Sequence, residues 1–224
     1  MSEPLPEDDL AARLRGFGPV GVLATLAVLA AAAVLGSFKA LPVLLWAWRS
    51  RTPWRDLGFV RPANWARTAV VAVILGVAFK LAMKSVVMPL LGAPPINPAY
   101  HYLAGNPAVL PLMLFHVFVG AAFGEEVVFR GFLFERWRRL CGDGRLARVA
   151  IVILSSALFA AAHYPDQGVP GMQQALVTGL VFGSVYAATG RIWGVVIAHA
   201  AFDLAAVAII FCNLETTVAH WFFR

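Results

Sequence analysis

The chain of 224 residues is 60% hydrophobic and only 13% charged, and its mean hydropathy is +0.76. Soluble domains are roughly 45–50% apolar and about 25% charged, so the composition excludes an ordinary soluble protein and predicts a single integral membrane domain over residues 1–224. The net charge of +6 does not indicate a nucleic-acid partner, because the arginines are grouped in short loops between apolar runs.

Apolar runs close to the ~20 residues that cross a bilayer follow one another along the chain. They lie at about 17–37, 68–91, 108–134, 147–163, 171–189 and 191–212. These runs predict an all-α, polytopic transmembrane helix bundle of about six spans. A shorter apolar stretch, Ala40–Trp48, follows Lys39 and contains Pro42, and it would add a seventh span if it crossed separately.

Arginine is concentrated in alternate loops. The loops 49–67 and 136–148 hold five arginines each, whereas 92–107 and 164–170 hold no lysine or arginine. Because cytoplasmic loops carry the positive excess, we predict six spans with both termini outside. The short loops favour a prokaryotic cytoplasmic membrane. The lipid bilayer is therefore a predicted partner of the chain. Arg13 and Arg15 argue instead for an inside N-terminus, which would require Ala40–Trp48 to be an extra crossing.

Two glutamates and an arginine, Glu125, Glu126 and Arg130, stand inside the third apolar run. Charge in mid-bilayer costs roughly 2.5–3.5 kcal/mol per group and marks a functional interior by default. Glu126 and Arg130 are four residues apart with the carboxylate first, the favoured order for a helical ion pair. Glu125 points about 100° away and is left for another task. The alternative is a purely structural pair that joins helices.

Two later runs each carry a histidine. His163 ends the fourth run, and His199 precedes Asp203 by four residues in the sixth, so His199 and Asp203 share a helix face. A helix rises about 1.5 Å per residue, which allows these groups and Glu125 to meet in one layer of the bilayer. Each histidine alone could be structural, but together they favour a buried site built from three spans.

Small and basic residues add two further signals. The patterns Gly120-x-x-x-Gly124 and Gly179-x-x-x-Gly183 allow close helix approach, and the first ends directly before the glutamate pair. Lys80 and Lys84 lie one turn apart in the second run. They could hold a substrate carboxylate or compensate the acids.

The ordered motifs Glu125-Glu126-x-x-x-Arg130, Phe159-x-x-x-His163 and His199-x-x-x-Asp203 resemble those of the CAAX protease and bacteriocin-processing (CPBP) family, which includes the Ras-converting CAAX endopeptidase. The resemblance covers about residues 108–211, which it identifies as the catalytic core. It implies an intramembrane endopeptidase whose site opens toward the cytosol. The implied partner is a membrane-embedded or membrane-associated peptide or protein substrate, such as a C-terminal tail.

The resemblance also implies residue roles. Glu125, with His163, would activate a water for attack on the scissile carbonyl, while Glu126 and Arg130 would orient and charge-balance that base. His199 and residue 203 would stabilise the oxyanion. Eukaryotic members usually have asparagine at the last position, whereas this chain has Asp203; an ionised carboxylate would repel an oxyanion, so Asp203 must be protonated, orient His199 or serve another role.

Other functions remain open at this stage. No cofactor is expected, but one glutamate with two histidines, Glu125, His163 and His199, also matches a catalytic zinc ligand set, although the sequence lacks the H-E-x-x-H motif. A non-enzymatic peptide-binding or immunity protein would not need the whole motif set. A proton-coupled carrier would use buried acids and histidines as a relay, and repeat-related broken helices would favour it, but the sequence shows no such repeat.

Overall fold

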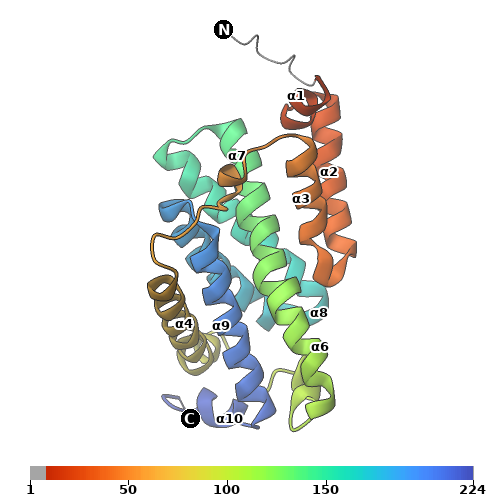
Figure 1. The fold of residues 1–224 in the computed structure, drawn as a ribbon. Helices are drawn as coiled ribbons and strands as arrows, with labels where there is room; N and C mark the ends of the chain where they lie inside the picture. Colours follow the sequence, from red (N-terminus) through yellow and green to blue (C-terminus); the bar gives the residue numbers. More distant parts are fainter. Residues whose placement is uncertain (1–8, 224) are drawn as a thin grey trace.

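Helices form every regular element in residues 9–223, the part of the chain that the computed structural model describes (Figure 1). The all-α prediction is therefore confirmed. The α-helices are α1 (Asp9–Arg15), α2 (Pro19–Val34), α3 (Ala40–Arg49), α4 (Trp65–Ala82), α5 (Met88–Leu90), α6 (Leu110–Phe115), α7 (Leu133–Cys141), α8 (Arg145–Thr189), α9 (Ile192–Phe211) and α10 (Glu215–Ala219). Three π-helical stretches are η3 (Met83–Val87), η6 (His116–Glu125) and η7 (Val127–Phe132), and short 3₁₀ turns are η1 (Gly36–Phe38), η2 (Trp54–Leu57), η4 (His101–Leu103) and η5 (Pro107–Val109).

Within residues 9–223, four helical segments are long and apolar enough to cross a membrane. They are Trp65–Leu90, Pro107–Cys141, Arg145–Thr189 and Ile192–Phe211, and a fifth is added if α1 and α2, bent by 64° relative to each other, count as one span. The predicted number of about six spans is slightly higher than this count. The main reason is that two of the predicted spans, 147–163 and 171–189, fall into the one long run α8.

The long run α8 is a pair of helices joined at Gly168. This glycine has φ 62° and ψ −160°, a left-handed conformation that side-chain-bearing residues rarely adopt, and Pro165 and Pro170 flank it. Beyond the break the chain folds back, since a Cβ on Gly179 would lie 3.0 Å from the Cβ of Ser156. The second glycine pattern thus serves the close approach of the two halves of α8.

The first helices form a hairpin that enters the bundle and returns to the same end. Trp46, late in α3, donates its indole N–H to the Leu14 carbonyl at 3.3 Å, which places the end of α3 beside the end of α1, just before α2 begins. Figure 1 shows α2 and α3 side by side near α7. Ten residues of α3 rise only about 15 Å, roughly half of the ~30 Å hydrocarbon core, so Ala40–Trp48 is too short to be a full crossing.

The described chain ends lie at opposite ends of the bundle. Arg136 donates to the Arg15 carbonyl at 3.0 Å, so the N-terminal helix α1 lies beside the basic loop 136–148. The helix α10 lies at the far end with the C-terminus (Figure 1). This arrangement differs from the predicted one, in which both termini lie on the same side, because the α2–α3 hairpin does not cross the bundle and leaves the N-terminal end beside the basic loops.

The loops sort by charge as the arginine pattern predicts. The basic loop 49–67 is tied to the start of α9 by a hydrogen bond from the Ile192 amide to the Gly58 carbonyl (2.9 Å). The loops that lack lysine and arginine meet at the opposite end, where the Gln167 amide donates to the Tyr100 hydroxyl at 3.1 Å.

Close packing brings the turn between α2 and α3 against the helical segment Pro107–Cys141, called the central helix below. A Cβ on Gly120 would lie 2.9 Å from the Cα of Ser37, and one on Gly124 would lie 2.8 Å from Cγ of Lys39. The first glycine pattern therefore admits the turn between α2 and α3 beside the glutamate pair. The glutamates themselves lie where two π-helical stretches, η6 and η7, meet, a rare geometry that is frequent at functional sites.

Candidate active site

Glu126 and Arg130 form a fully buried ion pair. Arg130 Nη1 donates to Glu126 Oε1 at 3.0 Å, and the two side chains are 1% and 0% exposed. The Arg130 guanidinium also lies 4.6 Å from the centre of the Phe159 ring, a cation–π contact. The predicted pair is confirmed, and it packs between the central helix and α8.

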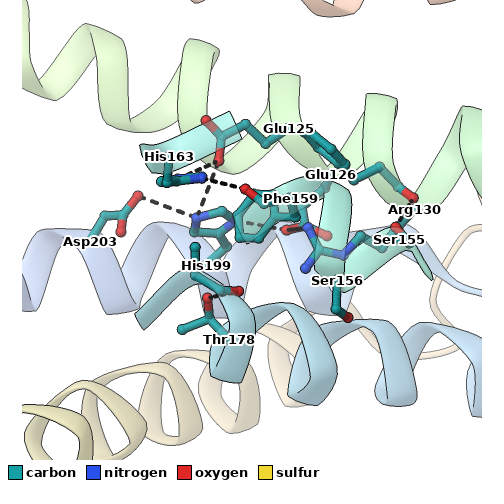
Figure 2. A network of polar contacts seen from close by, with 12 residues as sticks. Glu125, Glu126, Arg130, Ser155, Ser156, Phe159, His163, Thr178, His199 and Asp203 are labelled. Carbon is teal, nitrogen blue, oxygen red and sulfur yellow. Dashed lines mark hydrogen bonds and ion pairs between the residues drawn. The ribbon is translucent and has the colours of Figure 1, made fainter. Parts of the chain in front are cut away.

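His199 links this pair to the rest of the site. Its Nδ1 lies 2.7 Å from Glu126 Oε1. A carboxylate accepts hydrogen bonds, so Nδ1 carries the proton in this contact and the opposite nitrogen, Nε2, is directed at Glu125 and Asp203. Figure 2 shows His199 between these carboxylates. The same Glu126 oxygen thus holds an arginine on its own helix and a histidine on α9.

Glu125 occupies the other face of the helix. Its Oε1 accepts a hydrogen bond from Lys39 Nζ at 2.9 Å. Its Oε2 lies 3.9 Å from His163 Nε2 and 4.0 Å from His199 Nε2. These two separations are too long for direct hydrogen bonds, but one water molecule bound between the carboxylate and an imidazole would reach both.

His163 is oriented by its own helix. Its Nδ1 lies 2.8 Å from the Phe159 carbonyl, which only accepts, so Nδ1 carries a proton and the neutral ring leaves Nε2 as an acceptor facing Glu125. The ring also packs edge-on against Phe159, with centroids 4.5 Å apart. The four-residue spacing of Phe159-x-x-x-His163 therefore sets the orientation of the His163 ring.

Asp203 contacts His199, as their spacing predicts. Its Oδ2 lies 3.5 Å from His199 Nε2, the nitrogen that also faces Glu125. The structure therefore brings all six candidate residues together, namely Glu125, Glu126, Arg130, His163, His199 and Asp203 (Figure 2). In the described range 9–223, no group of three or more His, Cys, Asp or Glu side chains has an arrangement that could hold a metal ion.

A cavity of about 400 Å³ opens beside the cluster. Glu125, His163, His199 and Asp203 line it, whereas Glu126 and Arg130 do not. The cavity continues along α4 and past the 94–98 loop to α10, toward the end that lacks basic loops. The resemblance implies access from the cytosolic side; the cavity lining itself extends from the cluster toward the loops that hold no lysine or arginine.

Sequence reasoning missed Lys39. It lies 86 residues before its partner Glu125, and its position between two apolar runs was interpreted only as a break between helices. The signal available was the lysine itself, since a cation at bilayer depth needs a partner. A lysine at the turn of a short hairpin is a candidate to pair with a buried acid.

The fold and the cluster define a membrane-embedded helical protein with a buried site of carboxylates and histidines beside a cavity. Residues 107–205, a little less than half of the chain, match the family of type II CAAX prenyl endopeptidase Rce1-like proteins. The resemblance drawn from the three motifs is thereby confirmed over the segment that carries them, and the match supports a membrane-embedded protease of the CAAX type. No curated protein and no solved structure matches the chain.

Proposed function

We propose that the chain is a glutamate-dependent intramembrane endopeptidase in which Glu125 is the base. The observation that carries this proposal is the gap between Glu125 Oε2 and the Nε2 atoms of His163 and His199, 3.9 and 4.0 Å wide. A carboxylate and two imidazoles around a space for one water, facing a cavity, provide the groups that hydrolysis of an amide requires.

The attack step uses the two neighbouring acceptors. One hydrogen of the water bonds to Glu125 Oε2 and the other to His163 Nε2, which leaves an oxygen lone pair directed at the scissile carbonyl carbon. Glu125 takes the first proton as the carbon–oxygen bond forms. When the tetrahedral intermediate collapses, the carbon–nitrogen bond breaks and Glu125 returns the proton to the departing amine.

Oxyanion stabilisation falls to His199. Nδ1 of His199 donates to Glu126 Oε1 at 2.7 Å. When the ring is protonated, its second N–H group, on Nε2, can donate to the oxyanion. Fixed hydrogen-bond donors of this kind supply a large share of the rate enhancement. Asp203, 3.5 Å from the same nitrogen, orients the ring. In this role the carboxylate of Asp203 acts on His199 and does not itself bind the oxyanion.

The substrate we propose is a membrane-associated peptide or protein cleaved in its C-terminal tail. The family description names prenylated CAAX substrates, and a site buried among apolar helices suits a tail that a lipid group holds at the membrane. Residues 108–211 form the catalytic core of the one membrane domain, with Lys39 as an addition from outside it.

We propose a prokaryotic cytoplasmic membrane as the location. The positive-inside rule then puts the basic loops, and with them α1, on the cytosolic side. The α10 end faces the outside.

The proposed mechanism needs no metal. Lys39 Nζ lies 2.9 Å from Glu125 Oε1, and an ammonium group held against the carboxylate disfavours a divalent cation on the same residue. The alternative, a zinc site formed by Glu125, His163 and His199, predicts stoichiometric metal in the pure protein.

The deciding experiment measures metal content and cleavage of a membrane-tail peptide library, with and without a chelator, for wild type, Glu125→Gln and His163→Ala. Cleavage that survives the chelator and is lost in both variants supports the proposal. Chelator-sensitive cleavage with one zinc per chain supports the alternative. A Glu125→Gln variant that still binds peptide while wild type cleaves nothing would indicate a binding protein.

A further inference from the structure

The cavity beside the cluster contains a buried lysine that the proposed chemistry does not use. Lys80, on α4, is 7% exposed and lines the cavity together with Gln174 of α8. Its Nζ donates one hydrogen bond, to Gln174 Oε1 at 2.9 Å, and lies 4.7 Å from the centre of the Phe202 ring. An ammonium group has three donors, so two of them remain for another acceptor.

No carboxylate in residues 9–223 is within ion-pair distance of Lys80 Nζ. The next lysine along the helix differs: Lys84 is 3.7 Å from Glu215 Oε1 and donates to the Pro95 carbonyl. A buried charge without an opposite charge is strongly destabilising. Lys84 is thus paired directly within the chain. Lys80 has no contact ion pair: the carboxylates of Asp203 and Glu215 attract it only from longer range, and its remaining donors face the cavity.

The position of Lys80 relates it to the cleavage site. Phe202, under its ammonium group, comes three residues after His199 on α9, about 4.5 Å further along the helix axis. Glu125, His199 and Lys80 line the same cavity. A peptide lying in it would therefore pass from the hydrolytic water to the ammonium within a few residues, since an extended chain advances about 3.3 Å per residue.

We propose that Lys80 and Gln174 form a subsite for a peptide carboxylate on the product side of the cleaved bond. The ammonium donates charge-assisted hydrogen bonds to the carboxylate, and the Gln174 amide N–H group donates a further one. The subsite rests on the proposed endopeptidase function and adds to it the chemistry that positions the substrate. A terminal carboxylate and an acidic side chain carry the same group, and the test separates them.

The test is a binding measurement that needs no cleavage. The probes are N-acetyl-Ala-Val-Leu with a free C-terminal carboxylate, the same peptide as its amide, and N-acetyl-Ala-Val-Glu-amide, titrated against the full chain in lipid nanodiscs by calorimetry. For wild type and for Glu125→Gln we expect the free acid to bind at least about tenfold more tightly than the amide, the ratio typical of a charge-assisted hydrogen bond. Tight binding of the third peptide as well would identify a side-chain carboxylate as an equal ligand.

The variants locate the subsite. Lys80→Met and Gln174→Leu should reduce the preference for the acid toward unity, Lys80→Arg should retain most of it, and the matched control Lys84→Met should leave it intact. Equal binding of acid and amide to wild type, or a full preference in both Lys80→Met and Gln174→Leu, would overturn the subsite. Cleavage by wild type that is lost in Glu125→Gln would still support the endopeptidase in that case, so the two proposals fail separately.

Discussion

Two neighbouring glutamates divide the site into two regions of different character. On the Glu126 side, Oε1 holds Arg130 at 3.0 Å and His199 at 2.7 Å, Oε2 is buried without a hydrogen-bond partner, and neither Glu126 nor Arg130 lines the cavity. On the Glu125 side the polar atoms are 3.9 and 4.0 Å apart and face a cavity. A charged pair that is closed off from the cavity holds helices together, whereas a carboxylate that faces the cavity marks where water and substrate bind.

The largest effect is expected on the cavity side. Glu125→Gln keeps the shape of the side chain and removes the base, and we expect the cleavage rate to fall by roughly 10²–10⁴-fold, the range for loss of general base catalysis. The thermal unfolding midpoint should change little, because the glutamine oxygen can still accept the hydrogen bond that Lys39 Nζ donates to Glu125 Oε1 at 2.9 Å, and the distances from Glu125 to the two histidines are too long for hydrogen bonds. Single-turnover cleavage and a thermal melt of the same preparation measure both.

Retention of more than a few per cent of the wild-type rate would remove Glu125 as the base. Glu125→Ala serves as the second variant, since it excludes a residual role for the amide of glutamine. A large loss of stability in Glu125→Gln would instead mean that the division between the two regions is wrong.

The opposite pattern is expected for Arg130→Ala. Removing one partner of a buried ion pair leaves an uncompensated charge, which costs about 3–5 kcal/mol, and here Glu126 would lose its partner at 0% exposure. We expect a lower yield of folded protein and a lower unfolding midpoint together with lost activity. Normal yield and stability in detergent would contradict the structural role assigned to this side, and Arg138→Ala, at an exposed pair with Asp143, is the matched control.

Lys39 tests whether the α2–α3 hairpin belongs functionally to the cavity side. Lys39→Met removes the charge-assisted hydrogen bond to Glu125 Oε1, and we expect a loss of about tenfold in kcat from a disoriented base, with little change in KM. Lys39→Arg should restore most of the rate, because the guanidinium can donate to the same oxygen. Equal rates for wild type and Lys39→Met would show that the hairpin only covers the site.

The sequence predicted the cluster better than the path of the chain. Charged residues inside apolar runs, spaced by whole turns, fix which face each side chain occupies, and the Glu126–Arg130 and His199–Asp203 contacts follow from that spacing alone. Lys39 could not be assigned to Glu125, because that contact depends on how a hairpin folds back against Gly120 and Gly124.

The slightly high span count and the different position of the N-terminal end have a related cause. Hydropathy measures the length of an apolar segment and does not report its direction. The 16 residues of α2 and the ten residues of α3 that return beside them therefore resemble one span followed by a short apolar stretch. The break at Gly168 lies between two apolar runs that the sequence separates correctly, but the helical geometry continues on both sides of it. Basic loops were the more dependable guide, since they gather at one end as predicted.

The smallest effect is expected at Asp203, which lies on the border of the two regions. Its Oδ2 is 3.5 Å from His199 Nε2, and its side chain also lines the cavity. If Asp203 acts by orienting His199, Asp203→Asn keeps a hydrogen-bonding oxygen at the same place and should lower kcat/KM by only a few-fold, within about 1 kcal/mol, while Asp203→Leu should lose far more. Complete loss of cleavage in Asp203→Asn would show that the negative charge itself is required, and His199 would then depend on Asp203 as strongly as on Glu126.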